Sequence, residues 1–372
     1  MRLIACTFGC LTTSIKKLFL LYRLGLARMT FLKLFRVIVY VYRTKILRVE
    51  CPGAIIIGLT YRCQCKCVHC SVGLYSVEPE HEMSVDKIKS LLNQIVKLNI
   101  PKVNFFGGEP LLRGRDLVAL VQYGNDLGLH ISVDTNGIAL AEGFSRELKE
   151  AGINNINISV DSADRNIHDN LRGFEGAFDS AMTAIKNCLN ERIPCVISTY
   201  ASKRAIYSGD LNEIITLGRR MKVSAVKILL PIMSGRWAHS ECERLSQEER
   251  KKVNDMLDPG FVYLESPLFS VKSDKKICEA LDKKMVYISP HGDVQACYAV
   301  PFSFGNINNE ALHAILARMW SSEFFCKIGN DHECVMNNPH FRKIVGPELD
   351  KASGFPINYQ KIDTACQGCT KI

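Results

Sequence analysis

The sequence lacks an uninterrupted apolar run long enough to cross a membrane. In the apolar, basic segment 1–50, no charge-free stretch reaches the roughly 20 residues that a spanning helix needs. In the rest of the chain, basic and acidic side chains are equal in number, so that part has no net charge. Residues 1–50 carry ten basic side chains and one acidic side chain, which accounts for the whole formal charge of +9. We therefore expect no nucleic-acid binding by the body of the chain.

Core-forming residues and cysteines are plentiful. The chain has 372 residues, which is long enough for one full α/β domain and a smaller additional domain. Its composition, with 47% hydrophobic and 23% charged residues, is typical of a globular protein. Its 16 cysteines exceed what packing requires. Disulfide-dense secreted folds are usually much shorter. Closely spaced cysteines favour metal or iron–sulfur ligation in a reducing compartment, so we expect a cytoplasmic protein.

Strand and helix patterns alternate from residue 54 onward. Five amphipathic patterns predict helices, and Ser84 can cap the first of them. Six βα units in series predict an α/β fold with a parallel sheet, two units short of a closed eight-stranded barrel. We therefore predict a partial (β/α)6 TIM-like barrel. The six apolar runs typical of strands are Ile55–Leu59, Val103–Phe106, Ile131–Val133, Ile156–Val160, Val196–Tyr200 and Ala225–Leu230.

Three cysteines lie on one short loop after the first predicted strand. The spacing Cys63-x3-Cys67-x2-Cys70 offers three thiolates. They can hold three irons of a four-iron cluster and leave the fourth iron open for a cofactor. Half of a zinc site is the alternative, although zinc sites usually close with a second pair of thiolates or imidazoles. Cys65 lies inside the loop but outside this spacing, and we expect no ligand role for it.

Polar motifs follow the next three predicted strands. Because chemistry in a parallel βα barrel gathers at the carboxyl ends of the strands, we expect these motifs and the cysteine loop on one rim. Asp161 could instead be a turn-forming aspartate. The motifs are Gly107-Gly108-Glu109-Pro110, Asp134-Thr135-Asn136-Gly137 and Ser159-Val160-Asp161-Ser162.

The cysteine loop and the Gly-Gly-Glu-Pro motif together resemble the signature of the radical S-adenosylmethionine (radical SAM) enzymes. The resemblance implies a [4Fe–4S] cluster on Cys63, Cys67 and Cys70, with S-adenosyl-L-methionine (SAM) chelated by the open iron. It also implies reductive cleavage of SAM to a 5′-deoxyadenosyl radical, which removes hydrogen from a C–H bond of the substrate. The SAM-binding residues that it implies are Gly107, Gly108, Glu109, Asn136, Ser159, Asp161 and Arg172.

Each of these residues has an expected task. Glu109 would accept hydrogen bonds from the SAM ammonium group as a charge-assisted pair. The two glycines, which have no Cβ, would let ligand and backbone approach closely. By resemblance, Ser159 and Asp161 would contact the ribose hydroxyls, with Asn136 as a weaker candidate of the same kind. Arg172 resembles the position that binds the SAM carboxylate.

A second cysteine pattern begins at Cys278. Two short strand patterns around Pro290-His291-Gly292-Asp293 predict a β-hairpin that brings Cys297 toward Cys278. Gly292-x4-Cys297 resembles the SPASM and twitch extensions of radical SAM enzymes. Only six cysteines follow residue 270, too few for the two auxiliary clusters of a full SPASM form. The resemblance implies one auxiliary [4Fe–4S] cluster, with the ligands Cys278, Cys297, Cys366 and Cys369.

Two questions about this second pattern stay open. Cys334 or Cys326 could replace one ligand, because the separation between Cys297 and Cys366 is long. A zinc ribbon on the same two cysteine pairs is the alternative to a cluster. The chain is thereby divided into a basic amphipathic helical segment (1–50), a radical SAM partial-barrel core (51–235), a linker or helical segment (236–277) and a SPASM/twitch-like domain (278–372).

The basic segment has three interpretations. Lys33, Arg36, Tyr40 and Arg43 recur at helical spacing beside a broad apolar face. Such a helix could lie on an anionic membrane surface, peripherally on the inner face of the membrane. It could instead dock on the core with its basic edge in water, or form an arm that recognises a substrate or partner.

These observations predict a radical SAM oxidoreductase or maturase that acts on a peptide or a small natural product. The auxiliary cluster would assist oxidation or bond formation, and a flavodoxin- or ferredoxin-type protein would supply electrons. One alternative is the same chemistry on a membrane lipid or membrane-held substrate. Another is a non-catalytic iron–sulfur electron carrier. The residues do not identify the substrate.

Overall fold

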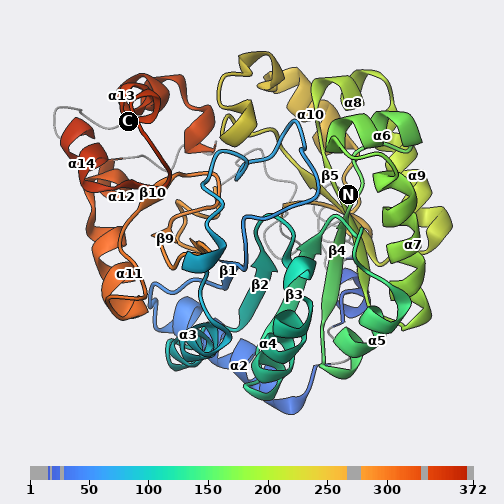
Figure 1. Ribbon diagram of the computed structural model, residues 1–372, viewed down its shortest axis with the longest axis horizontal. Helices are drawn as coiled ribbons and strands as arrows, with labels where there is room; N and C mark the ends of the chain where they lie inside the picture. Colours follow the sequence, from blue (N-terminus) through green and yellow to red (C-terminus); the bar gives the residue numbers. More distant parts are fainter. Residues whose placement is uncertain (1–15, 17–18, 26–28, 266–277, 328–333, 367–372) are drawn as a thin grey trace, which may run out of the picture. The chain divides into compact units, whose positions relative to one another are not determined.

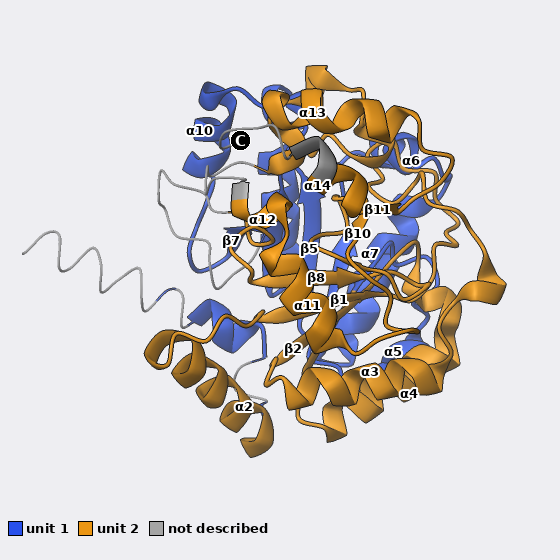
Figure 2. Ribbon diagram, turned by 90° about the vertical axis from the view of Figure 1, so that its left-hand side faces the viewer, with its two compact units in different colours: residues 1–29, 134–231, 245–273 blue, residues 30–133, 232–244, 274–372 orange. Residues whose placement is uncertain are grey.

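The computed structural model describes residues 16, 19–25, 29–265, 278–327 and 334–366 (Figure 1). The chain divides into two compact units, which Figure 2 distinguishes by colour. Each unit combines three segments that are distant in sequence. Unit 1 comprises residues 1–29, 134–231 and 245–273, and unit 2 comprises residues 30–133, 232–244 and 274–372.

Unit 2 contains the strand order β3-β2-β1-β8-β9. β1 (Ala54–Gly58) pairs in parallel with β2 (Lys102–Phe106) on one side and with β8 (Met285–Ile288) on the other. β2 also pairs in parallel with β3 (His130–Thr135), within which the boundary between the units falls. β8 pairs antiparallel with β9 (Val294–Gln295). The strand that precedes the cysteine loop therefore lies directly beside the strand of the C-terminal hairpin.

The helices of unit 2 include the predicted pair before and after β2. In the first of these, the Ser84 hydroxyl accepts a hydrogen bond from the Lys87 N–H at 3.2 Å, which confirms the predicted cap. A second, parallel pair of strands joins β10 (Phe302–Ser303) to β11 (Ile357–Asn358). The helical elements of this unit are α2 (Phe31–Val41), η2 (Tyr42–Ile46), η3 (Pro79–His81), α3 (Val85–Lys97), η4 (Pro110–Arg113), α4 (Gly114–Asp126), η5 (Gly235–Trp237), η6 (Glu241–Glu243), α11 (Leu312–Ser321), α12 (Glu323–Lys327), η7 (Val335–Asn337), α13 (Pro339–Asp350) and α14 (Gln360–Cys366).

The described residues of unit 1 contain four whole parallel strands, which follow one another in chain order. They are β4 (Asn155–Ser159), β5 (Cys195–Tyr200), β6 (Ala225–Leu229) and β7 (Val262–Leu264). Helix α7 packs on β4 and β5, and α9 packs on β6. The helices of this unit between residues 134 and 255 are α5 (Glu142–Glu150), α6 (Arg165–Arg172), α7 (Ala177–Asn190), α8 (Lys203–Tyr207), α9 (Asp210–Met221) and α10 (Gln247–Asp255).

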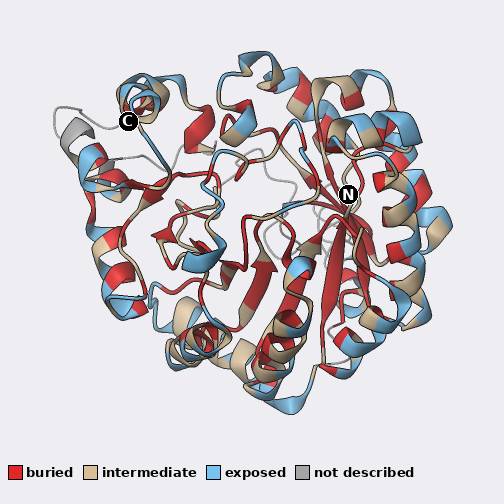
Figure 3. Ribbon diagram, in the orientation of Figure 1, coloured by how far each residue is buried: buried red, intermediate tan, exposed pale blue. Residues whose placement is uncertain are grey.

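The six predicted strands are all present, each within one or two residues of its expected ends at the described positions. The α/β fold class and the series of parallel βα units are confirmed. Strand β7 is an addition inside 236–277, where the sequence indicated only a linker or helix. It is three residues long, too short for a periodic pattern to show. Figure 3 shows that buried residues concentrate in the strands of each unit and on the helix faces that cover them.

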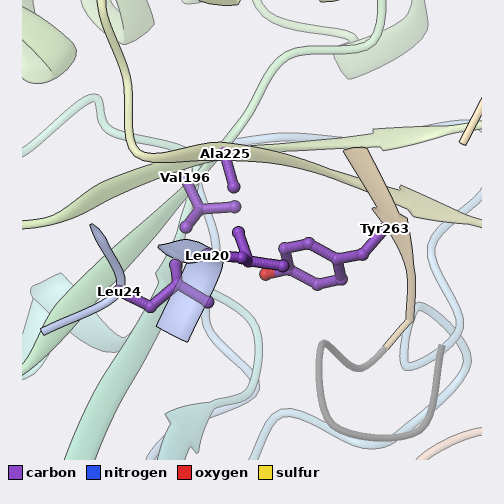
Figure 4. Close-up of a cluster of buried hydrophobic side chains, with 5 residues drawn as sticks. All are labelled: Leu20, Leu24, Val196, Ala225 and Tyr263. Carbon is purple, nitrogen blue, oxygen red and sulfur yellow. The ribbon is translucent and has the colours of Figure 1, made fainter. Parts of the chain in front are cut away.

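Part of the basic N-terminal segment docks on unit 1. Leu20 and Leu24 are buried there against strand residues (Figure 4). The Arg23 guanidinium donates a hydrogen bond to the Val223 carbonyl oxygen at 2.6 Å. Residues 19–25 therefore form part of the core of unit 1. Within the described part of the chain, no helix is both long enough and apolar enough to span a bilayer. The apolar cluster comprises Leu20, Leu24, Val196, Ala225 and Tyr263.

Candidate functional site

The cysteine loop and the Gly-Gly-Glu motif are joined through their backbones. The loop leaves β1, and the motif follows β2, its parallel neighbour. The Gly108 N–H donates to the Thr60 carbonyl oxygen at 2.6 Å, and the Glu109 N–H donates to that of Arg62 at 2.8 Å. The two motifs that the sequence separates by about 40 residues therefore form one structural element at the ends of adjacent strands.

Both glycines are required by the packing of this element. A Cβ atom at Gly107 would lie 2.3 Å from the Thr60 carbonyl oxygen, and one at Gly108 would lie 2.3 Å from that of Arg62. Gly107 also has a φ of +138°, which side chains disfavour. The sequence predicted close approach of a ligand at these glycines. The close neighbour in the structure is the backbone of the cysteine loop.

Glu109 is completely buried. Its Oε1 accepts a hydrogen bond from the Leu111 N–H at 3.0 Å and so caps the short helix η4. A buried carboxylate needs such partners, because an unpaired one is costly to desolvate. The cap fixes the side chain at the end of β2, where the sequence placed it.

The thiols of the loop lie close together. The Cys65 N–H donates to the Cys63 Sγ at 3.4 Å. A hydrogen bond between the Cys65 and Cys63 thiols lowers the pKa of Cys63, and bonds to the Cys63 and Cys67 sulfurs raise the pKa of Cys65. Burial raises the pKa of Cys70 to about 11. The structure thus places the Cys65 thiol, for which no ligand role was expected, among the thiols of the expected ligands.

The donor set of this loop fits an iron–sulfur cluster. It supplies the three expected thiols on one short segment, and a backbone N–H already points at the Cys63 sulfur, the kind of contact that tunes cluster potentials. Across the residues that the structure describes, no three His, Cys, Asp or Glu side chains already stand in the arrangement of a metal site.

Arg236, which lies on a distant segment of unit 2, binds the cysteine loop through two hydrogen bonds. Its N–H donates to the Cys70 carbonyl oxygen at 3.0 Å, and its Nη1 donates to the Cys67 carbonyl oxygen at 2.9 Å. The preceding Gly235 has a φ of +57°, and a Cβ there would lie 2.2 Å from the Cys70 carbonyl oxygen. Sequence reasoning missed this residue, since no local pattern marks it.

A buried aromatic cluster connects the cysteine loop to the C-terminal hairpin. The Tyr61 and Tyr75 rings stack at 4.9 Å, and Cys70 and Tyr298 both pack against this cluster. The Tyr75 hydroxyl donates to the Gln295 Oε1 at 3.0 Å. Residues from β9 and from the end of the cysteine loop thus share one core within unit 2.

The predicted β-hairpin is confirmed. The Ser289 N–H donates to the Asp293 carbonyl oxygen at 2.8 Å across its turn. Cys297 follows β9, and its Sγ accepts a hydrogen bond from the Ala299 N–H at 3.5 Å. Both Cys70 and Cys297 contribute, after burial, to the raised pKa of the Tyr287 hydroxyl, so this buried tyrosine lies near both cysteines.

The remaining C-terminal cysteines are described in part. Cys278 is half-buried just before β8, and Cys334 is half-buried at the start of η7. Cys326 is exposed on α12, with its Sγ 3.9 Å from the Ser321 carbonyl oxygen. Cys366 ends α14, and Cys369 lies outside the described residues. The four-cysteine ligand set stays a prediction.

In unit 1, two expected SAM-binding residues bind each other. The Arg172 Nη2 lies 2.7 Å from the Asp161 Oδ2, and both side chains are buried. The Asp161 N–H donates to the His168 Nδ1 at 3.1 Å, and burial lowers the pKa of His168 to about 4, so its ring is neutral. Arg172 ends α6, a helix that the sequence patterns did not reveal.

The other two expected residues of unit 1 lie at strand ends. Ser159 ends β4 and is half-buried. Asn136 follows β3, and its Oδ1 accepts a hydrogen bond from the Ile138 N–H at 2.9 Å. Such a bond shapes the turn, a structural task that the sequence analysis did not give to Asn136.

Two family models match this chain. Residues 57–202 match the radical SAM superfamily, and residues 278–370 match SPASM, an iron–sulfur cluster-binding domain. The chain belongs to the radical SAM superfamily. This identifies it as an enzyme of the radical SAM class that carries a SPASM-type domain, as the cysteine patterns predicted.

Curated relatives differ in how much of this radical SAM enzyme they match. An Fe-coproporphyrin III synthase of Methanosarcina barkeri is 30% identical over 54% of this chain, which spans 49% of that relative's length. An AdoMet-dependent heme synthase of the same organism is 26% identical, covering 86% of this chain and 91% of the relative. A PqqA peptide cyclase of Rhizobium meliloti is 26% identical, covering 72% and 74%.

A solved structure shows the same fold. Streptococcus suis SuiB bound to its precursor peptide SuiA superposes with a TM-score of 0.62 at 15% identity, covering 88% of this chain and 78% of SuiB. The match supports the predicted partial-barrel fold.

The strands of unit 1 carry polar residues that sequence reasoning did not assign. Asp134, on β3, accepts hydrogen bonds from Lys227 on β6 at 3.3 Å and from Asn157 on β4. Asn155 donates to Asn157 at 2.9 Å. The alternation Asn155-Ile156-Asn157-Ile158-Ser159 was the available signal, because it puts polar side chains on one face of a strand whose other face is apolar.

A cavity of about 410 Å³ lies in unit 2 beside the start of the cysteine loop. Arg62, which directly precedes Cys63, lines it together with Arg113 and Arg115. Arg62 pairs with Glu82 at 3.1 Å, and Arg113 pairs with Asp116 at 2.7 Å. Arginines thus outnumber carboxylates in this lining, in which Arg115 is exposed.

Proposed function

We propose that this enzyme binds a [4Fe–4S] cluster through Cys63, Cys67 and Cys70 and cleaves SAM reductively to abstract hydrogen from a C–H bond. The observation that carries the proposal is the backbone pairing of Gly108 and Glu109 with the cysteine loop. That pairing joins the backbone of Glu109, whose carboxylate is anchored, to the segment that leads into the three cysteines. A simple electron carrier would not need this arrangement.

When bound, the reduced cluster and SAM supply a carbon-centred radical that can attack an unactivated C–H bond. The residues of the chain position and protect this chemistry. Arg236 anchors the Cys67–Cys70 backbone, and the Cys65 N–H stabilises negative charge on the Cys63 sulfur. Burial holds the Glu109 side chain in place, so its carboxylate would bind the SAM ammonium group without first changing conformation.

The SAM contacts proposed for unit 1 are Ser159 and Asp161 for the ribose, Asn136 as a weaker candidate, and Arg172 for the carboxylate. The ion pair between Asp161 and Arg172 holds both side chains in place at the ends of β4 and α6. In the proposal this pair is the preorganised part of the cofactor site.

A single auxiliary [4Fe–4S] cluster on Cys278, Cys297, Cys366 and Cys369 completes the proposal, within a domain that spans residues 278–372. The N–H···S bond at Cys297 supports its ligand role. The division into a core at 51–235 and a connecting segment at 236–277 is part of the same proposal. Such a cluster suits net oxidation or bond formation better than isomerisation.

The proposed substrate is a peptide or a small natural product. Two comparisons support this class: the PqqA peptide cyclase, and SuiB with its bound precursor peptide. The heme synthase relative spans 86% of this chain and favours a tetrapyrrole as the natural product to test first. A membrane-held substrate is the second candidate, which the exposed face of α2 favours.

A flavodoxin- or ferredoxin-type protein is the proposed reductant. These proteins are acidic, and the arginine-rich cavity beside Cys63 offers them a complementary surface. Arg115→Glu should slow cluster reduction by flavodoxin severalfold at low salt and leave reduction by dithionite unchanged. Equal flavodoxin rates for both proteins would exclude this surface.

The test of the main proposal is anaerobic turnover of the reconstituted full-length protein with SAM and dithionite. The wild type should release 5′-deoxyadenosine, detected by mass spectrometry. The variant Cys63→Ala/Cys67→Ala/Cys70→Ala should release none and retain about one four-iron cluster per chain. Cys242→Ala, at an exposed cysteine on η6, is the matched control and should behave as wild type. A wild type that binds iron but forms no 5′-deoxyadenosine would refute the proposal.

A further inference from the structure

Helix α2 docks on unit 2 through its basic edge. Lys33 is only 3% exposed. The Arg36 Nε donates to the Leu127 carbonyl oxygen at 2.7 Å, and a Cβ at Gly53 would lie 2.9 Å from the Tyr40 hydroxyl. A docked helix was expected to bury its apolar face and leave the basic edge in water. The structure shows the opposite orientation.

Close contacts fix this orientation. Gly128 has a φ of +75°, and a Cβ there would lie 2.4 Å from the Leu32 Cγ and 3.1 Å from the Arg36 Nε. His130, at the start of β3, is half-buried, and its pKa is lowered by desolvation and by the neighbouring charges of Lys102 and Lys33. The basic edge therefore packs against the α4–β3 turn and Gly53, and the helix cannot roll without breaking these contacts.

The apolar face of the helix consequently points to solvent. Phe31 is 84% exposed and Ile46 is 66% exposed, which is unusual for such large apolar side chains. They belong to a continuous set that runs from α2 through η2 into the following segment. We call this set the α2 face: Phe31, Leu34, Phe35, Ile38, Val41, Tyr42, Ile46 and Leu47.

Charge identifies what the α2 face meets. Lys45 and Arg48 are exposed beside it, and residues 31–49 contain no acidic residue. Glu50, the first acid that follows, lies 2.6 Å from Lys283. An apolar face whose charged neighbours within residues 31–49 are all cations matches an anionic lipid surface, which accepts the apolar side chains among the acyl chains and the cations at the headgroups.

We propose that the α2 face seats this enzyme on an anionic membrane surface. A second copy of the chain is a poorer occupant, because symmetric contact would bring the same cations together with no acid between them. The proposal stands independently of the SAM chemistry. Together with it, the α2 face directs the substrate search toward lipids and membrane-held molecules.

The experiment is anaerobic flotation of the full-length protein with vesicles of phosphatidylcholine alone or with about 30 mol% phosphatidylglycerol, which gives the surface a negative potential. The wild type should float with the anionic vesicles and lose at least about half of its binding as salt rises from low to roughly 0.5 M. Phe35→Ser/Ile38→Ser should bind at least about tenfold more weakly, since each side chain contributes apolar burial. Lys45→Glu/Arg48→Glu should lose the preference for anionic vesicles.

Val77→Ser is the matched control, because Val77 is an exposed apolar residue of unit 2 outside the α2 face, and it should float as wild type. Unchanged flotation of Phe35→Ser/Ile38→Ser would overturn the proposal, as would a wild type that does not float. A wild type that sediments as a dimer and fails to bind vesicles would assign the face to a second copy. All variants should form 5′-deoxyadenosine at the wild-type rate, so failure here is distinct from failure of the radical chemistry.

Discussion

The Arg236 Nη1 donates a hydrogen bond to the Cys67 carbonyl oxygen at 2.9 Å, joining two segments that lie 169 residues apart. A second hydrogen bond, from the Arg236 backbone N–H to the Cys70 carbonyl oxygen, anchors the loop at another point. The cysteine loop is therefore shaped by a residue that no cysteine spacing reveals. Its positive charge also lies near the thiols, where it opposes the rise in pKa of Cys70 that burial causes.

Arg236→Leu should loosen the first cluster. The substitution removes a charged donor from a carbonyl oxygen, a loss of about 1.5–3 kcal/mol. We expect lower iron retention and a faster loss of the cluster signal by electron paramagnetic resonance after dilution into chelator. Arg165→Gln, which breaks an exposed ion pair with Asp179, is the control and should change little. Equal iron retention in the Arg236 variant and the wild type would contradict the role.

Gly108→Ala should disrupt the junction between the cysteine loop and β2. The added methyl group would meet the Arg62 carbonyl oxygen at 2.3 Å, so the two backbones must separate. We expect a lower melting temperature and less bound iron after reconstitution. Gly143→Ala is the control, because its Cβ meets nothing within 4 Å and lies in helix α5. That change should stabilise the protein by about 0.5–1 kcal/mol.

Lys33→Met should stabilise the protein at neutral pH. Burial lowers the pKa of Lys33 from 10.5 to about 8. Between these values the unfolded chain binds a proton that the folded chain releases, so this residue makes the free energy of unfolding rise with pH. Below about pH 8 its full penalty, up to about 3 kcal/mol, applies.

The measurement for Lys33→Met is urea unfolding of both proteins from pH 7 to pH 10.5. The difference between them should be largest at pH 7 and shrink toward pH 10.5. A difference that stays constant with pH would show that the Lys33 ammonium carries no such penalty.

The ion pair of Asp161 and Arg172 should show strong coupling. Both side chains are buried, so removing one partner leaves a desolvated charge and costs about 3–5 kcal/mol. Asp161→Ala and Arg172→Met should each destabilise unit 1, and the double variant should lose much less than the sum of the two. Urea unfolding of the three variants measures this coupling. Additive losses would mean that the two charges are not paired in solution.

The sequence alone determined the class of enzyme and the elements that carry its motifs. Iron ligation depends on residue type and short spacing, and Cys63, Cys67 and Cys70 lie within one loop. The parallel strands β1 to β6 were readable because each is a stretch of five or six residues with apolar residues at its centre, followed by a helix pattern or by turn residues. The hairpin before Cys297 was readable because turn residues separate two strand patterns. All these signals are local, so no knowledge of distant contacts was needed.

Only the tertiary structure decided how distant segments meet. Pairing of β8 with β1 joins residues more than 200 positions apart. The hydrogen bonds from Arg236 to the cysteine loop leave no periodic pattern in the sequence. The same holds for the ion pair that engages both Asp161 and Arg172. Helix α2 gives the clearest case. Its amphipathic pattern was visible, but which face docks depends on the surface it meets. Unit 2 offers a carbonyl oxygen to Arg36 and closely packed glycines to Arg36 and Tyr40.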